Sequence, residues 1–292
     1  MALKQFTIGI IGVGMVGEQL RRYFSDIKKL KRGKNLFLYD IDPKKSYSDD
    51  VNKADVVFVS VPTPRGPDGA WNISAVESVF RTITGSKIMV IKSTVPPGTT
   101  DMFQKKYPKH KVLFNPEFLT ESQAWEDMIK PDRQIVGFTS KSKEAASAVL
   151  SLLPAAPFMS PWGSGYKKYM VTALEAEIAK IFANAFFSMK VTFANHLADA
   201  CEHLGADYEN VRTAVASDYR IGQSHMDVHH AGYRGFGGFC LPKDIDGLIM
   251  FLKKRRLDPK LFEVVRECNK KLLKRQDLTI EKVSAHDKDI KL

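Results

Sequence analysis

Cys240 lies in a stretch whose residue types suit a reactive thiol. The run GFGGFCLPKD, residues 235–244, places this cysteine between a glycine cluster and a proline. Glycine lets the backbone approach a ligand closely, and proline is favoured in the first turn of a helix. We therefore predict that Cys240 lies at a helix N-terminus, where the helix dipole and the charge of Lys243 favour a thiolate. Such a thiolate is a nucleophile for covalent catalysis.

A glycine cluster near the start of the chain suits a dinucleotide. The run GVGMVG, residues 12–17, follows a short apolar run and precedes a helical pattern. In this context Gly12 permits a tight turn, Gly14 lets a pyrophosphate approach, and Gly17 lets the helix pack on the strand. The alternative is a turn in which the glycines serve packing alone. Asp40 ends the next apolar run, where a carboxylate binds the ribose of NAD and repels the 2′-phosphate of NADP.

Two loops and one helical pattern carry further candidate groups. The runs VPTP (61–64) and STVPPGT (93–99) each follow an apolar run, so we expect them at the carboxyl ends of strands, where ligands bind. Ordinary loop structure is the alternative. Lys180 and Asn184 are four residues apart in a helical pattern and share one face among apolar neighbours. They either act on a ligand together, or Lys180 reaches solvent and Asn184 has no role.

The elements that must position these residues are readable in the first half of the chain. Short apolar runs alternate there with helical patterns, which predicts βαβ units and a parallel sheet with helices on both faces. The expected strands are 7–11, 36–39, 55–61, 87–92, 112–114 and 135–138, and the expected helices are 15–30 and 73–83.

The second half of the chain reads as helical. A stretch rich in proline and glycine, residues 154–165, predicts a boundary between a Rossmann-type NAD-binding domain (1–165) and a helical domain (166–292). Residues 171–204 contain no glycine or proline, which predicts one long helix of about 50 Å, suited to connecting domains or forming a dimer. Further helices are expected at 208–216, 245–254 and 260–274.

The composition limits the class of protein. The chain has 292 residues, of which 44% are hydrophobic, with three cysteines and a formal net charge of +11. This length suits about two domains, and so few cysteines indicate no disulfide scaffold. Without a signal peptide or a long uncharged apolar run, we expect a cytoplasmic protein with no membrane partner. The basic runs lack a motif that reads nucleic acid, so we expect no nucleic-acid partner.

The remaining histidines and cysteines predict no metal site. His225, His229 and His230 lack a companion pattern of cysteine or carboxylate ligands, so we expect no bound metal. Cys201 and Cys268 lie in helical patterns without a glycine cluster or a proline beside them. We expect both to be packing thiols.

Taken together, the motifs resemble the UDP-glucose/GDP-mannose dehydrogenase family and occur in the family's order. The resemblance implies an NAD-dependent, four-electron oxidation of the primary alcohol of a nucleotide sugar to a carboxylate. It implies UDP-glucose as the leading substrate, and it implies that the reaction passes through a thiohemiacetal and a thioester of the cysteine. Residues 235–244 are the most specific match. The matching segments are 12–17, 61–64, 92–96, 115–121, 176–184, 218–222 and 235–244.

The resemblance also implies roles for the matched residues. Cys240 would be the nucleophile, and Lys180 and Asn184 would stabilise negative charge on the substrate oxygen. Asp244 with Thr94 would position water, and Glu121 would serve in acid–base work or hydrolysis. The expected NAD contacts are Gly12, Gly14, Met15, Val16, Gly17, Asp40, Pro62, Thr63, Thr94 and Lys243. The expected substrate contacts are Glu117, Phe118, Leu119, Lys180, Asn184, Arg220, His225, Phe236 and Gly237.

The sequence departs from the family in one respect. Full-length members usually carry a third domain, a second α/β unit that holds the nucleotide, and we expect this domain to be missing here. A separate chain would then supply it, or the helical domain and a homodimer partner would hold the substrate, or the chain would be a degraded relative. Two other functions stay open: a dehydrogenase of another hydroxy substrate, which needs no cysteine, and a non-catalytic NAD-binding subunit.

Overall fold

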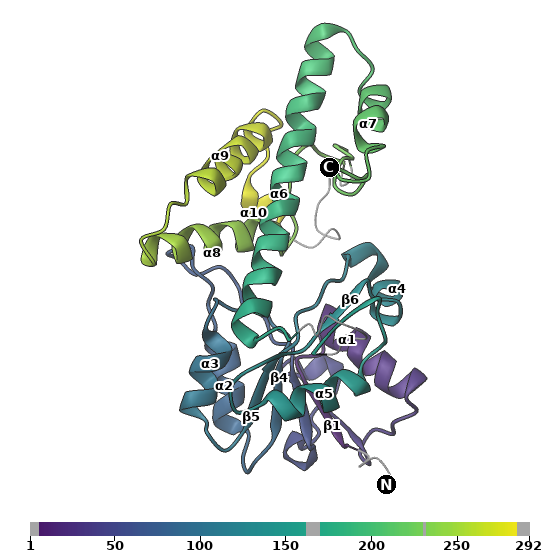
Figure 1. The fold of residues 1–292 in the computed structure, drawn as a ribbon, viewed down its shortest axis with the longest axis vertical. Helices are drawn as coiled ribbons and strands as arrows, with labels where there is room; N and C mark the ends of the chain where they lie inside the picture. Colours follow the sequence, from purple (N-terminus) through teal and green to yellow (C-terminus); the bar gives the residue numbers. More distant parts are fainter. Residues whose placement is uncertain (1–5, 162–169, 230–231, 285–292) are drawn as a thin grey trace. The chain divides into compact units, whose positions relative to one another are not determined.

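The chain divides into two compact units in the computed structural model, which describes residues 6–161, 170–229 and 232–284 (Figure 1). Unit 1 comprises residues 1–64 and 72–180, and unit 2 comprises residues 65–71 and 181–292. Unit 2 therefore includes a short segment from the N-terminal half of the chain. The boundary expected between residues 165 and 166 lies outside the described residues and stays a prediction.

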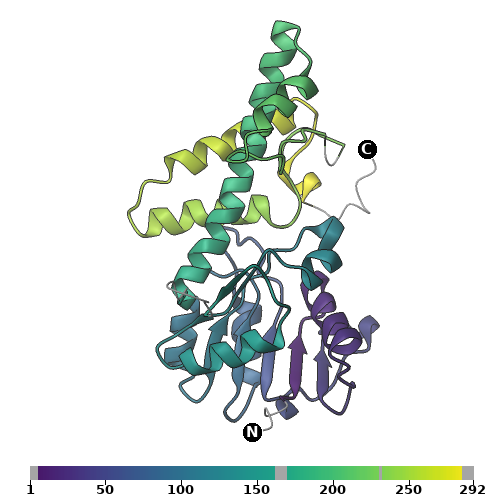
Figure 2. The ribbon, with the colours of Figure 1, turned by 45° about the vertical axis from the view of Figure 1, so that its right-hand side comes forward.

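Unit 1 is built on a six-stranded sheet (Figure 2). The strand order is β2-β1-β3-β4-β5-β7; the first five strands are parallel, and β7 is antiparallel to β5. Continuous apolar runs form the central strands because both faces are buried. A second, two-stranded sheet pairs β6 with β8. The strands are β1 (Ile8–Ile11), β2 (Leu36–Tyr39), β3 (Val56–Val59), β4 (Ile88–Ile91), β5 (Lys111–Phe114), β6 (Arg133–Ile135), β7 (Gly137–Phe138) and β8 (Phe158–Ser160).

Helices cover both faces of the large sheet. Val57 and Val59 point into a core shared with α2 and α3, whereas Val56 and Phe58 point into a core shared with α1, α4 and α5. This arrangement confirms the Rossmann-type fold expected from the alternating pattern. The helices of unit 1 are α1 (Met15–Arg22), η1 (Tyr23–Ile27), η2 (Pro43–Lys45), η3 (Val51–Lys53), α2 (Ser74–Thr82), α3 (Thr99–Lys106), η4 (Glu121–Gln123), α4 (Ala124–Ile129) and α5 (Lys143–Leu152).

Unit 2 is helical, as expected, and contains most of one long helix. Helix α6 (Ala173–Leu204) has 32 residues and begins in unit 1 (Figure 1). Helices α8 and α9 pack against each other. In the described part of the chain, we find no helix that combines the length and the apolar character needed to cross a membrane. The other helices of unit 2 are α7 (Tyr208–Ala216), α8 (Leu241–Lys254), α9 (Lys260–Lys274) and α10 (Ile280–Val283).

The prediction of a single strand at residues 135–138 is wrong, because the chain passes there from the two-stranded sheet to the six-stranded sheet. β6 ends at Ile135, and Val136 still donates its N–H to the carbonyl of Ser160 at 2.9 Å. β7 then begins at Gly137, where a Cβ atom would lie 2.8 Å from the side chain of Ala176. Gly137 therefore begins β7 in close contact with α6. The helix expected at 15–30 is also shorter, because α1 and η1 together end at Ile27.

Candidate active site

The glycine cluster forms the turn between β1 and α1. Gly12 has φ +85, and a Cβ there would lie 2.7 Å from the carbonyl oxygen of Ser60. A Cβ on Gly17 would lie 1.9 Å from the carbonyl oxygen of Gly12. Internal packing therefore accounts for Gly12 and Gly17. Gly14 differs, because it is exposed and a Cβ there would meet nothing within 4 Å.

The open space at Gly14 distinguishes the two interpretations of the glycine cluster, a dinucleotide site and a turn in which the glycines serve packing alone. Packing alone gives no reason for a glycine at this position, whereas a pyrophosphate approaching the N-terminus of α1 does. Met15 and Val16 begin α1 beside this space, and the side chain of Met15 is partly exposed. The turn therefore fits a dinucleotide.

Asp40 follows β2 beside the same turn. Its Oδ2 accepts hydrogen bonds from the Val13 N–H at 2.7 Å and from Lys45 Nζ at 2.9 Å. Its Oδ1 accepts one from the Asp42 N–H at 2.9 Å. Burial opposes ionisation, but these donors together lower the pKa of Asp40 below its usual value. The structure thus places an ionised carboxylate beside the glycine turn, and it adds Lys45, which the sequence did not indicate.

The two loops at the carboxyl ends of β3 and β4 are joined. Ser93 Oγ donates a hydrogen bond to the carbonyl of Val61 at 2.6 Å, which holds the second loop against the first. Pro62 is exposed on the first loop and Thr63 is buried. Thr94 is half-buried on the second loop. These contacts place the residues predicted for the cofactor on neighbouring loops at one edge of the sheet.

Lys180 forms a buried ion pair in unit 1. Its Nζ lies 3.0 Å from Glu117 Oε1, and both side chains are at most 9% exposed. The Leu119 N–H donates to Glu117 Oε2 at 2.7 Å. Burial alone would raise the pKa of Glu117, but Lys180 and this N–H lower it below its usual value. The ring of Phe118 lies 5.6 Å from Lys180 Nζ, so two predicted substrate contacts, Glu117 and Phe118, lie beside the ammonium.

A second buried lysine, Lys92, lies near this pair. Its Nζ donates to Asn115 Oδ1 at 2.8 Å. Burial lowers the pKa of Lys92 to about 8, Glu117 opposes this change, and Lys180 adds to it. Glu121, predicted for acid–base work, is exposed in η4.

Cys240 is the N-cap residue of α8, the place that the glycine cluster and Pro242 predict. It is half-buried, and its carbonyl accepts the Asp244 N–H at 2.9 Å. Cys201, in contrast, is buried, and Cys268 is half-buried within α9.

Asp244, one turn after Cys240, joins several predicted residues of unit 2. It is 1% exposed. Its Oδ2 accepts a hydrogen bond from Asn184 Nδ2 at 2.6 Å. Its Oδ1 accepts hydrogen bonds from Lys243 Nζ at 2.6 Å and from Trp71 Nε1 at 2.8 Å. Asn184, Lys243 and Asp244 thus lie together, and Trp71 was not foreseen.

The glycine-rich loop before Cys240 is held by residues that the sequence did not indicate. Asn269 Oδ1 accepts the Phe236 N–H at 2.7 Å, and Asn269 Nδ2 donates to the Phe236 carbonyl at 2.9 Å. A Cβ on Gly237 would lie 2.1 Å from the hydroxyl of Tyr233. A residue larger than glycine at position 237 would therefore clash with Tyr233.

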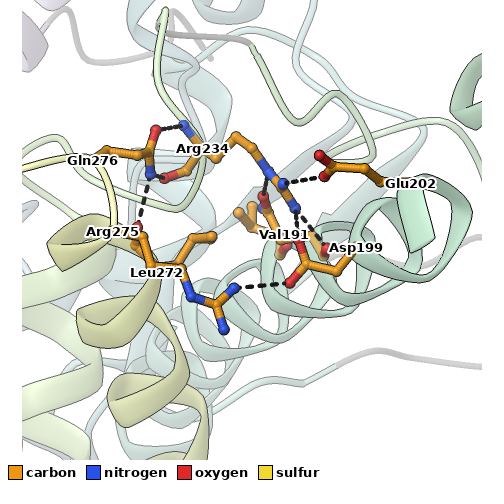
Figure 3. Close-up of polar contacts among 8 residues, drawn as sticks. Val191, Asp199, Glu202, Arg234, Leu272, Arg275 and Gln276 are labelled. Carbon is orange, nitrogen blue, oxygen red and sulfur yellow. Dashed lines mark hydrogen bonds and ion pairs between the residues drawn. The ribbon is translucent and has the colours of Figure 1, made fainter.

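Arg234 anchors the start of this loop to α6 and to Gln276, which follows α9 (Figure 3). Its Nη2 donates to Asp199 Oδ1 at 2.6 Å, and its Nε donates to Asn195 Oδ1 at 3.0 Å. Its backbone exchanges two hydrogen bonds with the amide of Gln276, at 2.8 and 2.9 Å. Only the chain fold brings these residues together, so no local motif could have indicated them.

Arg220 and His225 lie in the segment that follows α7. Arg220 is exposed, and its Nε pairs with Asp218 at 3.0 Å. His225 has φ +63 and stacks on Phe187 at 4.2 Å between ring centroids. His230 lies outside the described residues. Among the residues that are described, no three histidine, cysteine or acidic side chains are grouped to hold a metal.

Both units are similar to one family of proteins. The family model for the NAD-binding domain of the UDP-glucose/GDP-mannose dehydrogenases matches residues 40–152. The family model for the central domain matches residues 174–271.

Individual relatives agree with these matches. The UDP-glucose 6-dehydrogenase of Rickettsia bellii is 32% identical over 254 residues, which cover 84% of this chain and 55% of that protein. The enzyme of the same name from Bacillus subtilis is 35% identical over 247 residues, which cover 79% and 50%. The structure of a UDP-glucose dehydrogenase from Pyrobaculum islandicum matches with a TM-score of 0.77 at 26% identity, covering 94% of this chain and 72% of that one. The chain spans about half the length of the curated relatives that it matches.

Proposed function

Because the chain belongs to the UDP-glucose/GDP-mannose dehydrogenase family and carries its NAD-binding domain, we propose that it oxidises the primary alcohol of a nucleotide sugar to a carboxylate. The names of the relatives make UDP-glucose the leading candidate for the substrate. The observation that carries the proposal is the position of Cys240 at the N-terminus of α8, one turn before an Asp244 that Asn184 holds.

The cofactor would lie on the glycine turn and beside Asp40. Gly12, Gly14 and the first turn of α1 would hold the pyrophosphate, and Asp40 would hold the ribose. Bound NAD supplies the acceptor for a hydride, and two molecules used in turn account for the four electrons removed from each sugar.

The chain's own residues would manage the covalent chemistry. The Cys240 thiolate attacks the aldehyde formed in the first oxidation, which gives a thiohemiacetal and prevents its escape. Loss of a second hydride from that carbon gives a thioester. Asp244 positions the water that opens the thioester, takes up its proton, and releases the carboxylate and the thiol. Lys180 and Asn184 would donate hydrogen bonds to the substrate oxygen as negative charge develops on it.

A sugar-nucleotide assay tests the proposal. Incubation with NAD and UDP-glucose should yield two NADH and one UDP-glucuronate, which absorbance at 340 nm and chromatography of labelled sugar would quantify. GDP-mannose and N-acetylated UDP-sugars serve as alternative substrates. Tight NAD binding without turnover of any sugar nucleotide would favour a non-catalytic subunit instead.

Replacing Asp40 with alanine should weaken NAD binding more than it weakens NADP binding. The variant loses the acceptor for the ribose hydroxyls and the charge that repels a 2′-phosphate, so the preference for NAD should fall by about tenfold, or about 1.4 kcal/mol. Isothermal titration with each cofactor measures this ratio. Replacing Asp42 with alanine is the matched control, and an unchanged ratio in the Asp40 variant would contradict the assignment.

We also propose that α6 forms a homodimer. Leu174, Ile178, Phe182 and Phe186 recur every four residues along this helix, and each is at least 40% exposed. A row of large exposed apolar side chains on one helix face is typical of a surface that a second copy covers.

Replacing Phe186 with glutamate should convert the dimer to a monomer. The substitution places a charge within the apolar row, where burial against a second copy would leave it unpaired. Light scattering after size exclusion would show the mass fall by half. The matched control is Met102→Glu on α3, at a methionine that is 41% exposed and lies outside the row. A monomeric wild-type chain would refute the dimer.

A further inference from the structure

A short loop from the N-terminal half of the chain belongs to unit 2 and rests along α8. This loop, residues 65–71, closes on itself through the Gly66 N–H and the Ala70 carbonyl at 2.7 Å. Arg65 pairs with Asp246 near the start of α8, and Asp68 pairs with Lys254 at its end, at 3.2 Å. The loop is therefore attached to α8 in the second turn and at the last residue of the helix.

Trp71 is the last residue of this loop and contacts Asp244 and Gly247 of α8. Its indole Nε1 donates the 2.8 Å hydrogen bond to Asp244 Oδ1, and both partners are buried. Its ring covers Gly247, where a Cβ would lie 2.3 Å from Trp71 Cε2. Any side chain at position 247 would displace the ring. The position of the indole therefore depends on a glycine at 247.

The indole N–H has a specific consequence for the carboxylate. An N–H donor favours the charged form of a carboxylate and fixes its plane, but it cannot take up a proton as a basic partner can. The charged and titratable neighbours of Asp244 include Lys243, which donates to Oδ1, and Cys240, one turn earlier on α8. Asp246, two residues after Asp244, forms ion pairs with Arg65 of the loop and, at 2.7 Å, with Arg266 of α9.

We propose that Trp71 is a positioning residue for the oxidation, acting through Asp244. Its indole N–H keeps Asp244 ionised and aimed, so that the carboxylate can orient water and accept its proton. The inference rests on the proposed function only for the role of Asp244; the contact itself is independent of it.

The test replaces Trp71 with phenylalanine, which keeps an aromatic ring over Gly247 and removes the N–H. The acidic limb of the pH profile of kcat/KM should move up by about one pH unit. A tenfold change in proton affinity corresponds to about 1.4 kcal/mol, near the lower end for a hydrogen bond to a charged group. NAD binding should be unchanged. Trp125→Phe is the matched control, because Trp125 stacks on Arg22 in unit 1 and should leave the limb where it is.

A second variant and a spectroscopic measurement guard against misfolding of the first. Gly247→Ala should move the limb in the same direction, because its methyl group displaces the Trp71 indole from Asp244 while both residues keep their side chains. The wild-type protein and the Asp244→Asn variant are both labelled with ¹⁵N-tryptophan. The indole resonance of Trp71 should differ between them, whereas that of Trp125 should not.

The outcomes separate this inference from the proposed function. A folded Trp71→Phe variant with the pH profile of the wild type would overturn the inference and leave the proposed activity intact. A wild-type chain that oxidises no sugar nucleotide would overturn the proposed function, and an indole resonance insensitive to Asp244→Asn would then overturn the inference as well.

Discussion

Replacement of Cys240 with alanine should reduce carboxylate formation from UDP-glucose by on the order of 10³-fold or more, because the aldehyde has no thiolate to trap it. No side-chain hydrogen bond from Cys240 caps α8, so the start of this helix should survive the substitution. The measurement is chromatography of labelled sugar beside NADH absorbance, which separates an alcohol, an aldehyde and an acid.

The other two cysteines give matched controls for this experiment. Cys201→Ala and Cys268→Ala remove a thiol from α6 and from α9, and both should keep the wild-type yield of acid. All three variants should bind NAD as the wild type does. Unchanged acid formation by Cys240→Ala would support a dehydrogenase of another hydroxy substrate, which has no covalent step.

Replacement of Lys180 with methionine should have two separable effects. The first is a loss of about 3 kcal/mol in the free energy of unfolding, because the buried carboxylate of Glu117 loses the partner 3.0 Å away. The second is a fall of about 10²-fold to 10³-fold in kcat, because a donor to the developing oxyanion is gone. Chemical denaturation and steady-state kinetics measure the two effects independently.

A double variant separates the structural effect from the catalytic one. In Lys180→Met with Glu117→Gln, neither charge of this ion pair is left buried without the other, so most of the stability should return while kcat stays low. Lys106→Met is the control for an exposed pair, because Lys106 meets Glu77 at 3.1 Å with its side chain 47% exposed, and it should cost less than 1 kcal/mol. Recovery of kcat in the double variant would assign Lys180 to structure alone.

Local patterns predicted the parts of the molecule that local physics determines. Parallel strands buried on both faces must be apolar throughout, so β1 to β5 were visible as short runs of such residues. The turn at Gly12 and the start of α8 after Cys240 were visible because glycine and proline restrict the backbone in known ways.

Contacts between distant segments left no local trace. Trp71 meets Asp244 across 173 positions of sequence, and no role was predicted for residues 65–71. Glu177 was likewise missed: it is buried, and it accepts the N–H groups of Gly98 and Thr100 at 2.6 and 2.8 Å. In the sequence it is only one acidic residue within a helical pattern.

The seating of Trp71 on Gly247 restricts how genes for such chains can recombine. A hybrid joined at residue 180 would inherit the loop at 65–71 from one parent and α8 from the other. If the second parent carried any residue larger than glycine at position 247, the indole of the first could not fit. Positions 71 and 247 should therefore be inherited as a pair, and chimaeras that exchange the halves of the chain need this loop transferred with the C-terminal half.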